Sequence, residues 1–427
     1  MSVESNAQTA KLTPLKTPCF EQMATLIETF PEHPFETLVL TTADLERFSC
    51  SQCGVCCALP WRIHLSQRYY ERWYTHFHND PSGRFQRPFT KLEETTASNF
   101  ADMRRQDNSN RCIFLTSDNR CYIHANYGEE ALPDVCKRYP RVELRHDNRY
   151  GSDYLLGSCQ TAPTLLTGDC QVYYYFEPQP RHERSLPLHL PEKYYAGELG
   201  KSQNYLWVAL MLDVLQLQVN TPLQRYASLH YSLEYLCLQD ELSALNTQQL
   251  QWLYREQIRH SSELNLAAAP IEEQKQALEW FFQLLEPSFL PLLDHARKIY
   301  HGQSPWPSLD SAERDCLNAF LEQFLIRKLM AMPYKNPFYE SISFAQKYFL
   351  LSLHLLMIQM MAHYYRSRTQ QPLNLKHLSQ AVNLVEGRYS QRRDWLEQQG
   401  ITQLNSEDCL ALMQTALSLN LGLMQAL

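Results

Sequence analysis

Glycine is scarce in this chain, with 12 residues among 427, and no two glycines are spaced as G-x-G. This absence excludes the G-x-G-x-x-G loop of dinucleotide-binding folds, and the phosphate-binding pattern G-x-x-x-x-G-K-[ST] is also missing. A nucleotide-like cofactor would therefore have to be held in some other way.

Long apolar runs are missing too. No stretch reaches the ~18 consecutive apolar residues of a membrane-spanning helix, and the most apolar segment, residues 348–361, is interrupted by Ser352, His354 and Gln359. Residues Met1–Pro18 are polar and lack the apolar core of a secretory signal. We therefore expect no transmembrane segment and a cytoplasmic location.

An excess of basic residues is also absent. The chain has 39 Lys+Arg against 46 Asp+Glu, which gives a net charge of −7, and this balance argues against nucleic acid as a partner. Apolar residues make up 44% and charged residues 20% of the chain, so a sizeable core can form. The length suits two or three domains, or one domain with a large accessory part.

The 13 cysteines are unevenly distributed. Ten lie within the first 170 residues, at positions 19, 50, 53, 56, 57, 112, 121, 136, 159 and 170. Because the cytosol keeps thiols reduced, a disulfide framework is not expected. Cys19, Cys170, Cys237, Cys316 and Cys409 are interpreted as buried core thiols.

The pattern along the chain predicts a mainly α fold, with a cysteine-rich, metal-binding N-terminal part with few short strands and a helical C-terminal domain. The predicted divisions are an N-terminal helix and connector (1–40), a cysteine-rich metal-cluster domain (41–176), a Pro-rich linker (177–200) and a helical domain (201–427). Short strands are expected at 142–145 and 171–176.

Apolar residues recur at helical spacing in several segments. An N-terminal helix is expected at Cys19–Phe30, and one near the C-terminus should be capped by Asn405 or Ser406. Shared helical faces are predicted for Leu206, Leu210, Val214 and Leu217; for Leu317, Phe320, Phe324 and Leu325; for Phe344, Tyr348, Leu351, Leu355 and Ile358; and for Leu410, Met413, Leu417, Leu421 and Met424.

The strongest motif is Cys50-Ser-Gln-Cys53-Gly-Val-Cys56-Cys57. Two-residue gaps allow a tight loop to aim successive sulfurs at one centre, as in zinc knuckles and iron–sulfur loops, and Gly54 supplies the turn. Pro60 occupies the place of the next cysteine in both the ferredoxin spacing and the radical S-adenosylmethionine spacing. We therefore expect further ligands from among Cys112, Cys121, Cys136 and Cys159, and no radical chemistry.

The spacing leaves several points open. The side chains of the adjacent residues Cys56 and Cys57 are expected to diverge, so that one serves the site while the other packs or serves a second site. The eight cysteines allow two four-sulfur sites, or one site and four buried thiols. All-sulfur ligands suit zinc and an iron–sulfur cluster equally well. His64, His124 and His146 lie near cysteines and are further candidate ligands.

Three segments resemble the flagellin lysine-N-methylase (FliB) family and, more broadly, proteins with a zinc- or iron-chelating cysteine cluster. They are the run from Cys53 to Ile63; the run from Cys112 to Arg141, which includes Cys-Ile-Phe-Leu and Val-Cys-Lys-Arg-Tyr-Pro; and Leu156-Gly-Ser-Cys159-Gln-Thr-Ala-Pro. Gln160 and Thr161 depart from the family pattern, which has Pro and Glu there. The resemblance covers roughly residues 45 to 165.

The resemblance implies transfer of a methyl group from S-adenosylmethionine to lysine side chains of flagellin. It also implies an iron–sulfur cluster, of 4Fe-4S type, held by these cysteines. Neither the catalytic residues nor the donor site can be assigned from the sequence.

The basic run that includes Arg138 and Arg141 has two interpretations. These residues could neutralise a thiolate centre or bind the carboxylate of S-adenosylmethionine, or they could form an ordinary solvated surface. Tyr69, Tyr70, Trp73 and Tyr74 could offer cation–π contacts or pack as a helix face, and Tyr173–Tyr175 could do the same or form a core strand.

Two other functions compete with the methyltransferase. The first is a non-catalytic zinc- or iron-binding interaction protein, favoured by the lack of a recognisable donor-binding loop. The second is a redox protein that uses the cluster for electron transfer.

Overall fold

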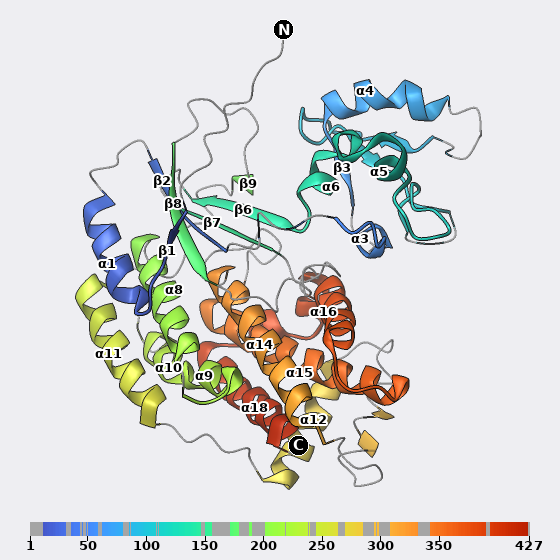
Figure 1. Ribbon diagram of the computed structural model, residues 1–427. Helices are drawn as coiled ribbons and strands as arrows, with labels where there is room; N and C mark the ends of the chain where they lie inside the picture. The colour runs from blue at the N-terminus through green and yellow to red at the C-terminus, as the bar shows by residue number, and fades with distance from the viewer. Residues whose placement is uncertain are drawn as a thin grey trace. The chain divides into compact units, whose positions relative to one another are not determined.

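The computed structural model divides the chain into two compact units, each described here by itself (Figure 1). The helical unit comprises Met1–Arg47, Glu143–Leu155 and Pro163–Leu427, and the cysteine unit comprises Phe48–Val142 and Leu156–Ala162. The structure describes residues 12–30, 36–42, 45, 48, 50–58, 62–79, 85, 87–107, 109, 111–146, 150–155, 171–178, 188–189, 201–217, 219–237, 239, 245–263, 270–284, 294–295, 297–298, 308–331, 342–389 and 393–425.

A six-stranded mixed sheet has the order β1-β8-β2-β7-β6-β9. Its strand β2 (Glu36–Thr42) runs antiparallel to β8 (Val172–Pro178) and parallel to β7 (Tyr150–Leu155). The run Leu-Val-Leu in β2 is fully buried, as expected for a strand covered on both faces. The other strands are β1 (Thr13–Pro14), β6 (Arg141–His146) and β9 (Leu188–His189). The strands predicted at 142–145 and 171–176 are confirmed as β6 and β8.

Helices make up most of the helical unit, so the predicted fold class is confirmed. They include all four helices whose apolar faces were predicted. In chain order they are α1 (Cys19–Thr29), α8 (Lys201–Gln216), α9 (Pro222–Ser228), α10 (His230–Cys237), α11 (Thr247–Glu263), α12 (Ile271–Leu284), α14 (Ser311–Ala331), α15 (Phe344–Thr369), α16 (Leu375–Tyr389), α17 (Arg393–Gln398), η7 (Ile401–Gln403) and α18 (Ser406–Gln425).

Helix α15 lies at the centre of the helical core. All but one of its residues from Phe344 to His363 are buried, because the helix is apolar on every side and packs against α16 and α18. Its buried polar groups find partners within the core. For example, the Asn420 side chain of α18 donates to the carbonyl of Ser352 (3.1 Å) and also contacts Gln359.

A buried carboxylate fixes the start of α1. Asp213 of α8 accepts hydrogen bonds from the backbone N–H groups of Cys19 (2.6 Å) and Phe20 (2.9 Å). A negative charge at the N-terminus of a helix stabilises the helix. The Phe20 ring stacks on Tyr254 of α11 with 4.5 Å between ring centroids. These contacts hold α1 beside α8 and α11, as Figure 1 shows.

Side-chain caps define several other helix starts. Thr221 and Ser343 form reciprocal capping boxes at α9 and α15. At α18 the Asn405 side chain accepts from the N–H of Asp408 (2.8 Å). The predicted choice between Asn405 and Ser406 therefore falls on Asn405.

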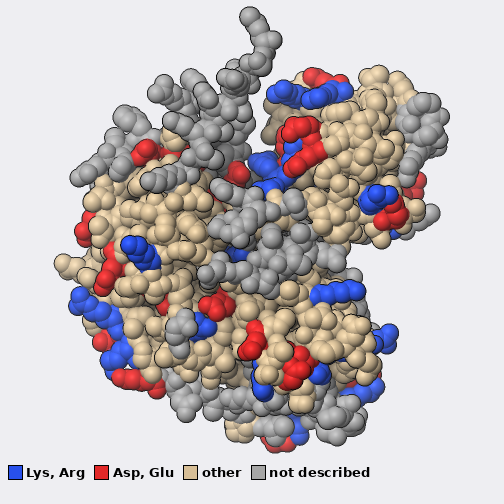
Figure 2. Space-filling model, in the orientation of Figure 1, with Lys and Arg blue, Asp and Glu red and all other residues tan. Residues whose placement is uncertain are grey.

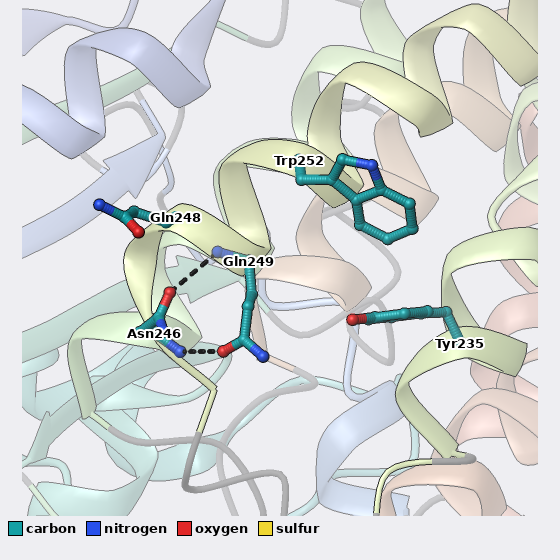
Figure 3. A pocket seen from close by; sticks show the side chains of 5 residues that line it. All are labelled: Tyr235, Asn246, Gln248, Gln249 and Trp252. Carbon is teal, nitrogen blue, oxygen red and sulfur yellow. Dashed lines mark hydrogen bonds between the residues drawn. The ribbon is translucent and has the colours of Figure 1, made fainter.

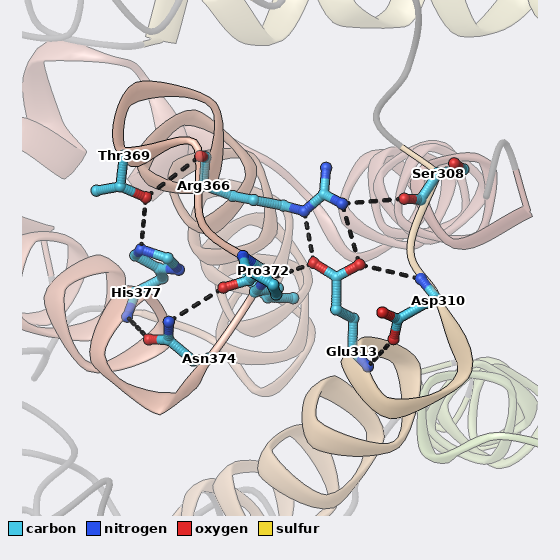
Figure 4. A network of polar contacts seen from close by, with 9 residues as sticks. Ser308, Asp310, Glu313, Arg366, Thr369, Pro372, Asn374 and His377 are labelled. Atoms are coloured by element: carbon cyan, nitrogen blue, oxygen red, sulfur yellow. Dashed lines mark hydrogen bonds and ion pairs between the residues drawn. The ribbon is translucent and has the colours of Figure 1, made fainter.

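A polar network ties the start of α14 to the end of α15 (Figure 4). Glu313 is 3% exposed and accepts from Arg366 Nε (2.6 Å), Arg366 Nη2 (3.0 Å) and the N–H of Asp310 (3.0 Å). It also accepts from the N–H of Leu373, in the segment that leads into α16. Three segments of the chain therefore depend on one carboxylate.

The cysteine unit is built from short elements around aromatic side chains. Its antiparallel sheet has the order β3-β5-β4, and helix α4 presents Tyr69, Trp73 and Phe77 to a cluster that includes Phe89 and Phe114. The elements are α3 (Val55–Ala58), β3 (His64–Leu65), α4 (Gln67–His78), β4 (Phe89–Lys91), β5 (Ala101–Met103), α5 (Tyr122–Tyr127), η2 (Glu129–Ala131) and α6 (Asp134–Arg138). Of the two interpretations of Tyr69, Tyr70, Trp73 and Tyr74, the structure supports helix-face packing.

The two units differ from the predicted domain boundaries. Residues 1–40 and the strands β7 and β8 belong to the helical unit, whereas the prediction placed both strands in a domain at 41–176. Cysteine content drove that prediction, but the strands pair with β2 and therefore join the unit that contains it. Of the predicted linker 177–200, most residues lie outside those described, and Leu188–His189 form β9, parallel to β6.

Cys19 and Cys409 are buried core thiols as predicted, Cys237 and Cys316 are half-buried, and Cys170 lies outside the described residues. Within the described part of the chain, no helix is long and apolar enough to cross a membrane. Figure 2 shows Lys and Arg side chains interspersed with Asp and Glu over the face that it draws.

Candidate metal centre

A tight loop carries the first four candidate ligands. Gln52 and Gly54 both have a left-handed backbone (φ 55° and 73°), which glycine adopts without strain. A Cβ atom on Gly54 would stand 2.0 Å from the carbonyl oxygen of Asn119. The loop can therefore press against the turn before Cys121 only with glycine at this position, as the motif predicts.

The thiols of Cys56 and Cys57 approach each other. Their sulfurs are 3.9 Å apart, so the prediction that these adjacent side chains diverge is wrong. Both residues lie in the single helical turn α3, where consecutive side chains are separated by about 100°, whereas along a strand they would point to opposite faces. Two thiolates bound to one zinc ion at about 2.3 Å would be about 3.8 Å apart.

Three more cysteines reach the same region from separate segments. The N–H of Cys112 donates to the carbonyl of Cys57 (2.8 Å). Cys121 pairs with Leu115 in an isolated β-bridge, begins helix α5 and hydrogen-bonds to the Cys57 thiol. Cys136 lies on α6 and interacts electrostatically with Cys112, Cys121 and Cys56.

The thiols perturb one another strongly. Hydrogen bonding from Cys57 lowers the pKa of Cys121 to about 7 and also lowers the pKa of Cys56. Those hydrogen bonds and burial raise the pKa of the donor Cys57, and burial raises the pKa of Cys112 to about 11. The cluster can hold one or two thiolates by itself, but ionising the rest requires a compensating cation.

The donor set fits a thiophilic metal. Seven of the eight predicted ligands lie in the cysteine unit, on the loop, the segment at Cys112, the turn before α5 and helix α6, and Cys159 lies outside the described residues. In the described residues, no three His, Cys, Asp or Glu side chains already stand in metal-binding positions. Ligation would therefore require rotation of the thiols around a backbone that has already brought them together.

Other predicted site residues have different surroundings. The Arg141 guanidinium lies over the Phe48 ring, 5.0 Å from its centroid, and donates to the carbonyl of Phe48. Arg138 is exposed at the end of α6. The ring nitrogen Nδ1 of His64 contacts Asp102 (2.7 Å), His124 is half-buried, and the side chain of His146 is outside the described part.

Sequence reasoning missed Arg105. Its Nη1 donates to the carbonyl of Cys57 (3.4 Å), and the residue pairs with Cys112 in a β-bridge. Arg105 lies seven residues before Cys112 and outside every cysteine motif, so no spacing rule could have identified it.

Residues 49–160 match a family model described as "Putative zinc- or iron-chelating domain". The match includes all eight predicted cysteine ligands, from Cys50 to Cys159. Comparisons with curated proteins and with solved structures found no match.

Proposed function

We propose that this protein is an S-adenosylmethionine-dependent protein-lysine N-methyltransferase that acts on flagellin, and that its cysteine unit holds an iron–sulfur cluster of 4Fe-4S type. The observation that carries the metal centre is the approach of the Cys56 and Cys57 thiols to each other, beside the segments that carry Cys112 and Cys121. The match at residues 49–160 supports a metal-chelating role. The methyltransferase activity rests on the three segments that resemble flagellin lysine-N-methylases.

The proposed reaction is an in-line displacement. The lysine nitrogen forms a bond to the methyl carbon while the carbon–sulfonium bond breaks, so that S-adenosylhomocysteine leaves as a neutral thioether. The lysine ammonium, whose usual pKa is about 10.4, must first give its proton to a base or to water. Alignment of nitrogen, carbon and sulfur is the main task of such a site.

The role of the metal in this proposal is to build the cysteine unit. Its elements are short, and the segments that carry Cys57, Cys112, Cys121 and Cys136 meet at the thiols. Because metal binding and folding are coupled at such sites, the centre would fix these segments relative to one another. Arg138, exposed beside Cys136, is our candidate for binding the carboxylate of the methyl donor.

Methyl transfer from labelled S-adenosylmethionine to purified flagellin tests the proposed activity. The metal-replete full chain should label flagellin lysines, and Arg138→Gln should raise the KM for the donor. Arg120→Gln, which removes an exposed arginine paired with Asp118, is the matched control. A metal-replete protein that labels no flagellin lysine would overturn the methyltransferase.

A metal-stabilised interaction protein is the second candidate, and one surface favours it. Tyr235 and Trp252, whose ring centroids are 5.1 Å apart, line a cavity of about 440 Å³ together with Asn246, Gln248 and Gln249 (Figure 3). Trp252 is 46% exposed, and exposed tryptophan is common at protein interfaces. Saturable binding of S-adenosylmethionine in calorimetry would argue against a non-catalytic protein. Zinc without iron or sulfide would favour it.

A further inference from the structure

We infer that Arg105 is a positioning residue of the metal centre, whose guanidinium donates an N–H group to a metal-bound cysteine sulfur. The inference rests on the proposed metal centre and names a function for a residue outside the cysteine motifs. Nothing in the inference depends on the methyltransferase activity.

Two backbone contacts place Arg105 at the centre. Its pairing with Cys112 sets the two residues opposite each other, and its Nη1 donates to the carbonyl of Cys57 (3.4 Å). That carbonyl also accepts from the N–H of Cys112 (2.8 Å). One carbonyl oxygen thus joins the side chain of Arg105 to the two segments that carry Cys57 and Cys112.

The other end of the guanidinium has no partner among the described residues. Its Nη2 is buried and forms no hydrogen bond, and no ion pair of Arg105 occurs among the residues that the structure describes. A buried N–H donor without an acceptor is costly, so a ligand group or an acceptor is expected beside it. The neighbouring Arg104 differs, because its Nη2 pairs with Asp107 (2.7 Å).

The surrounding charges favour a sulfur acceptor. Arg105 interacts electrostatically with Cys112 and Cys136, two of the predicted ligands. Metal ligation would turn these thiols into thiolates, which accept hydrogen bonds from guanidinium groups. The N–H contact would orient the sulfur and reduce its electron density. Groups that hydrogen-bond to metal ligands commonly orient and tune those ligands in this way.

Metal competition in the full chain tests the inference. Zinc-loaded wild type, Arg105→Gln, Arg105→Lys and the control Arg104→Gln would be titrated with a chromophoric chelator. We expect Arg105→Gln to lower the zinc affinity by about 10- to 100-fold, which is the usual loss when a residue that hydrogen-bonds to a metal ligand is replaced. The zinc affinity of Arg105→Lys should lie between those of the wild type and Arg105→Gln, since lysine keeps the positive charge but lacks the planar guanidinium group. Arg104→Gln should match the wild type.

The spectrum of the cobalt-substituted protein separates this role from simple packing. Loss of an N–H donor to sulfur should shift the thiolate-to-cobalt charge-transfer band to lower energy in Arg105→Gln, with a smaller shift in Arg105→Lys. If Arg105→Gln is insoluble, Arg105→Lys alone decides. Wild-type affinity together with a wild-type band in the soluble variants would overturn the inference. A wild type that binds neither zinc, cobalt nor an iron–sulfur cluster would instead overturn the proposed centre.

Discussion

The helical unit and the cysteine unit reach a folded state by different means. The helical unit buries long apolar helices, and α15 alone is buried over more than five turns. The cysteine unit has elements of 2 to 12 residues, an aromatic cluster and a set of thiols. Burial of apolar surface can stabilise the first, whereas the second has a small core and needs an additional link between segments. This contrast predicts that the cysteine unit needs metal to fold and that the stability of the helical unit hardly depends on it.

The largest effect should follow loss of the metal. Cys53→Ala or Cys121→Ala should abolish metal binding and unfold the cysteine unit, because a structural zinc site supplies about 10 kcal/mol or more of folding free energy. Removal of the metal by a chelator should have the same effect. Limited proteolysis with mass spectrometry should then show cuts within 48–142 and an intact helical unit.

Cys316→Ala is the matched control for these variants, because Cys316 is half-buried on α14 of the helical unit. It should keep the metal and the wild-type proteolysis pattern. Full metal content in Cys53→Ala would show that Cys53 is not a ligand. Equal proteolysis of both units on metal removal would contradict the contrast itself.

A core truncation in α15 should destabilise the helical unit and leave metal binding by the cysteine unit unchanged. Leu355 is 0% exposed, so Leu355→Ala should lower the free energy of unfolding of the helical unit by about 3 kcal/mol through lost burial and a cavity. Denaturant unfolding followed by circular dichroism measures this change. The metal content per chain should remain that of the wild type; a parallel loss of metal would mean that the units are not independent.

The Glu313 network should make the helical unit sensitive to acid. Burial disfavours the Glu313 carboxylate, but hydrogen bonds from Arg366, Leu373 and Asp310 outweigh it and lower the pKa of Glu313 to about 2. The stabilisation is complete above the usual pKa of 4.5 and is lost as the pH falls from there through 2. Glu313→Gln should cost about 3 kcal/mol at neutral pH and flatten the stability profile over that range.

Unfolding free energies measured between pH 2 and pH 6 would check this prediction. Glu407→Gln is a suitable control, since Glu407 lies in the exposed first turn of α18. It should leave the acid profile unchanged. A profile for Glu313→Gln as steep as that of the wild type would assign the acid sensitivity to other groups.

The smallest effect is expected at the cap of α18. Asn405→Ala removes the acceptor for the N–H of Asp408 and should lower the free energy of unfolding by about 1 kcal/mol. Asn405→Asp should retain most of the stability, because it keeps the accepting oxygen. Equal stability of Asn405→Ala and the wild type would mean that water or Ser406 replaces the cap.

Local patterns in the sequence predicted much of the helical unit. Helical spacing identified α8, α14, α15 and α18, and the strands β6 and β8 followed from their composition. The sheet order could not be predicted, because β2 pairs with β7 and β8 across more than 100 residues and nothing local encodes such pairing. Domain boundaries drawn from cysteine content failed for the same reason.

In the cysteine unit, spacing predicted the conformation of the cysteine loop better than the arrangement of its thiols. The gaps in Cys50–Cys57 and the role of Gly54 agree with the observed loop. The approach of Cys56 to Cys57 was missed, because it depends on the helical turn that holds them. Arg105 was missed because its position follows from a β-bridge to Cys112, a contact without a sequence motif.

Metal analysis of the anaerobically purified full chain tests the central claim most directly. Absorption, iron, acid-labile sulfide and zinc would be measured on one sample, alongside Cys121→Ala. The account predicts a stoichiometric metal centre that Cys121→Ala lacks; near-equal iron and sulfide with a broad brown absorbance would identify the proposed cluster, and zinc alone would identify a structural zinc site. A folded wild-type chain that contains none of these metals would contradict the account.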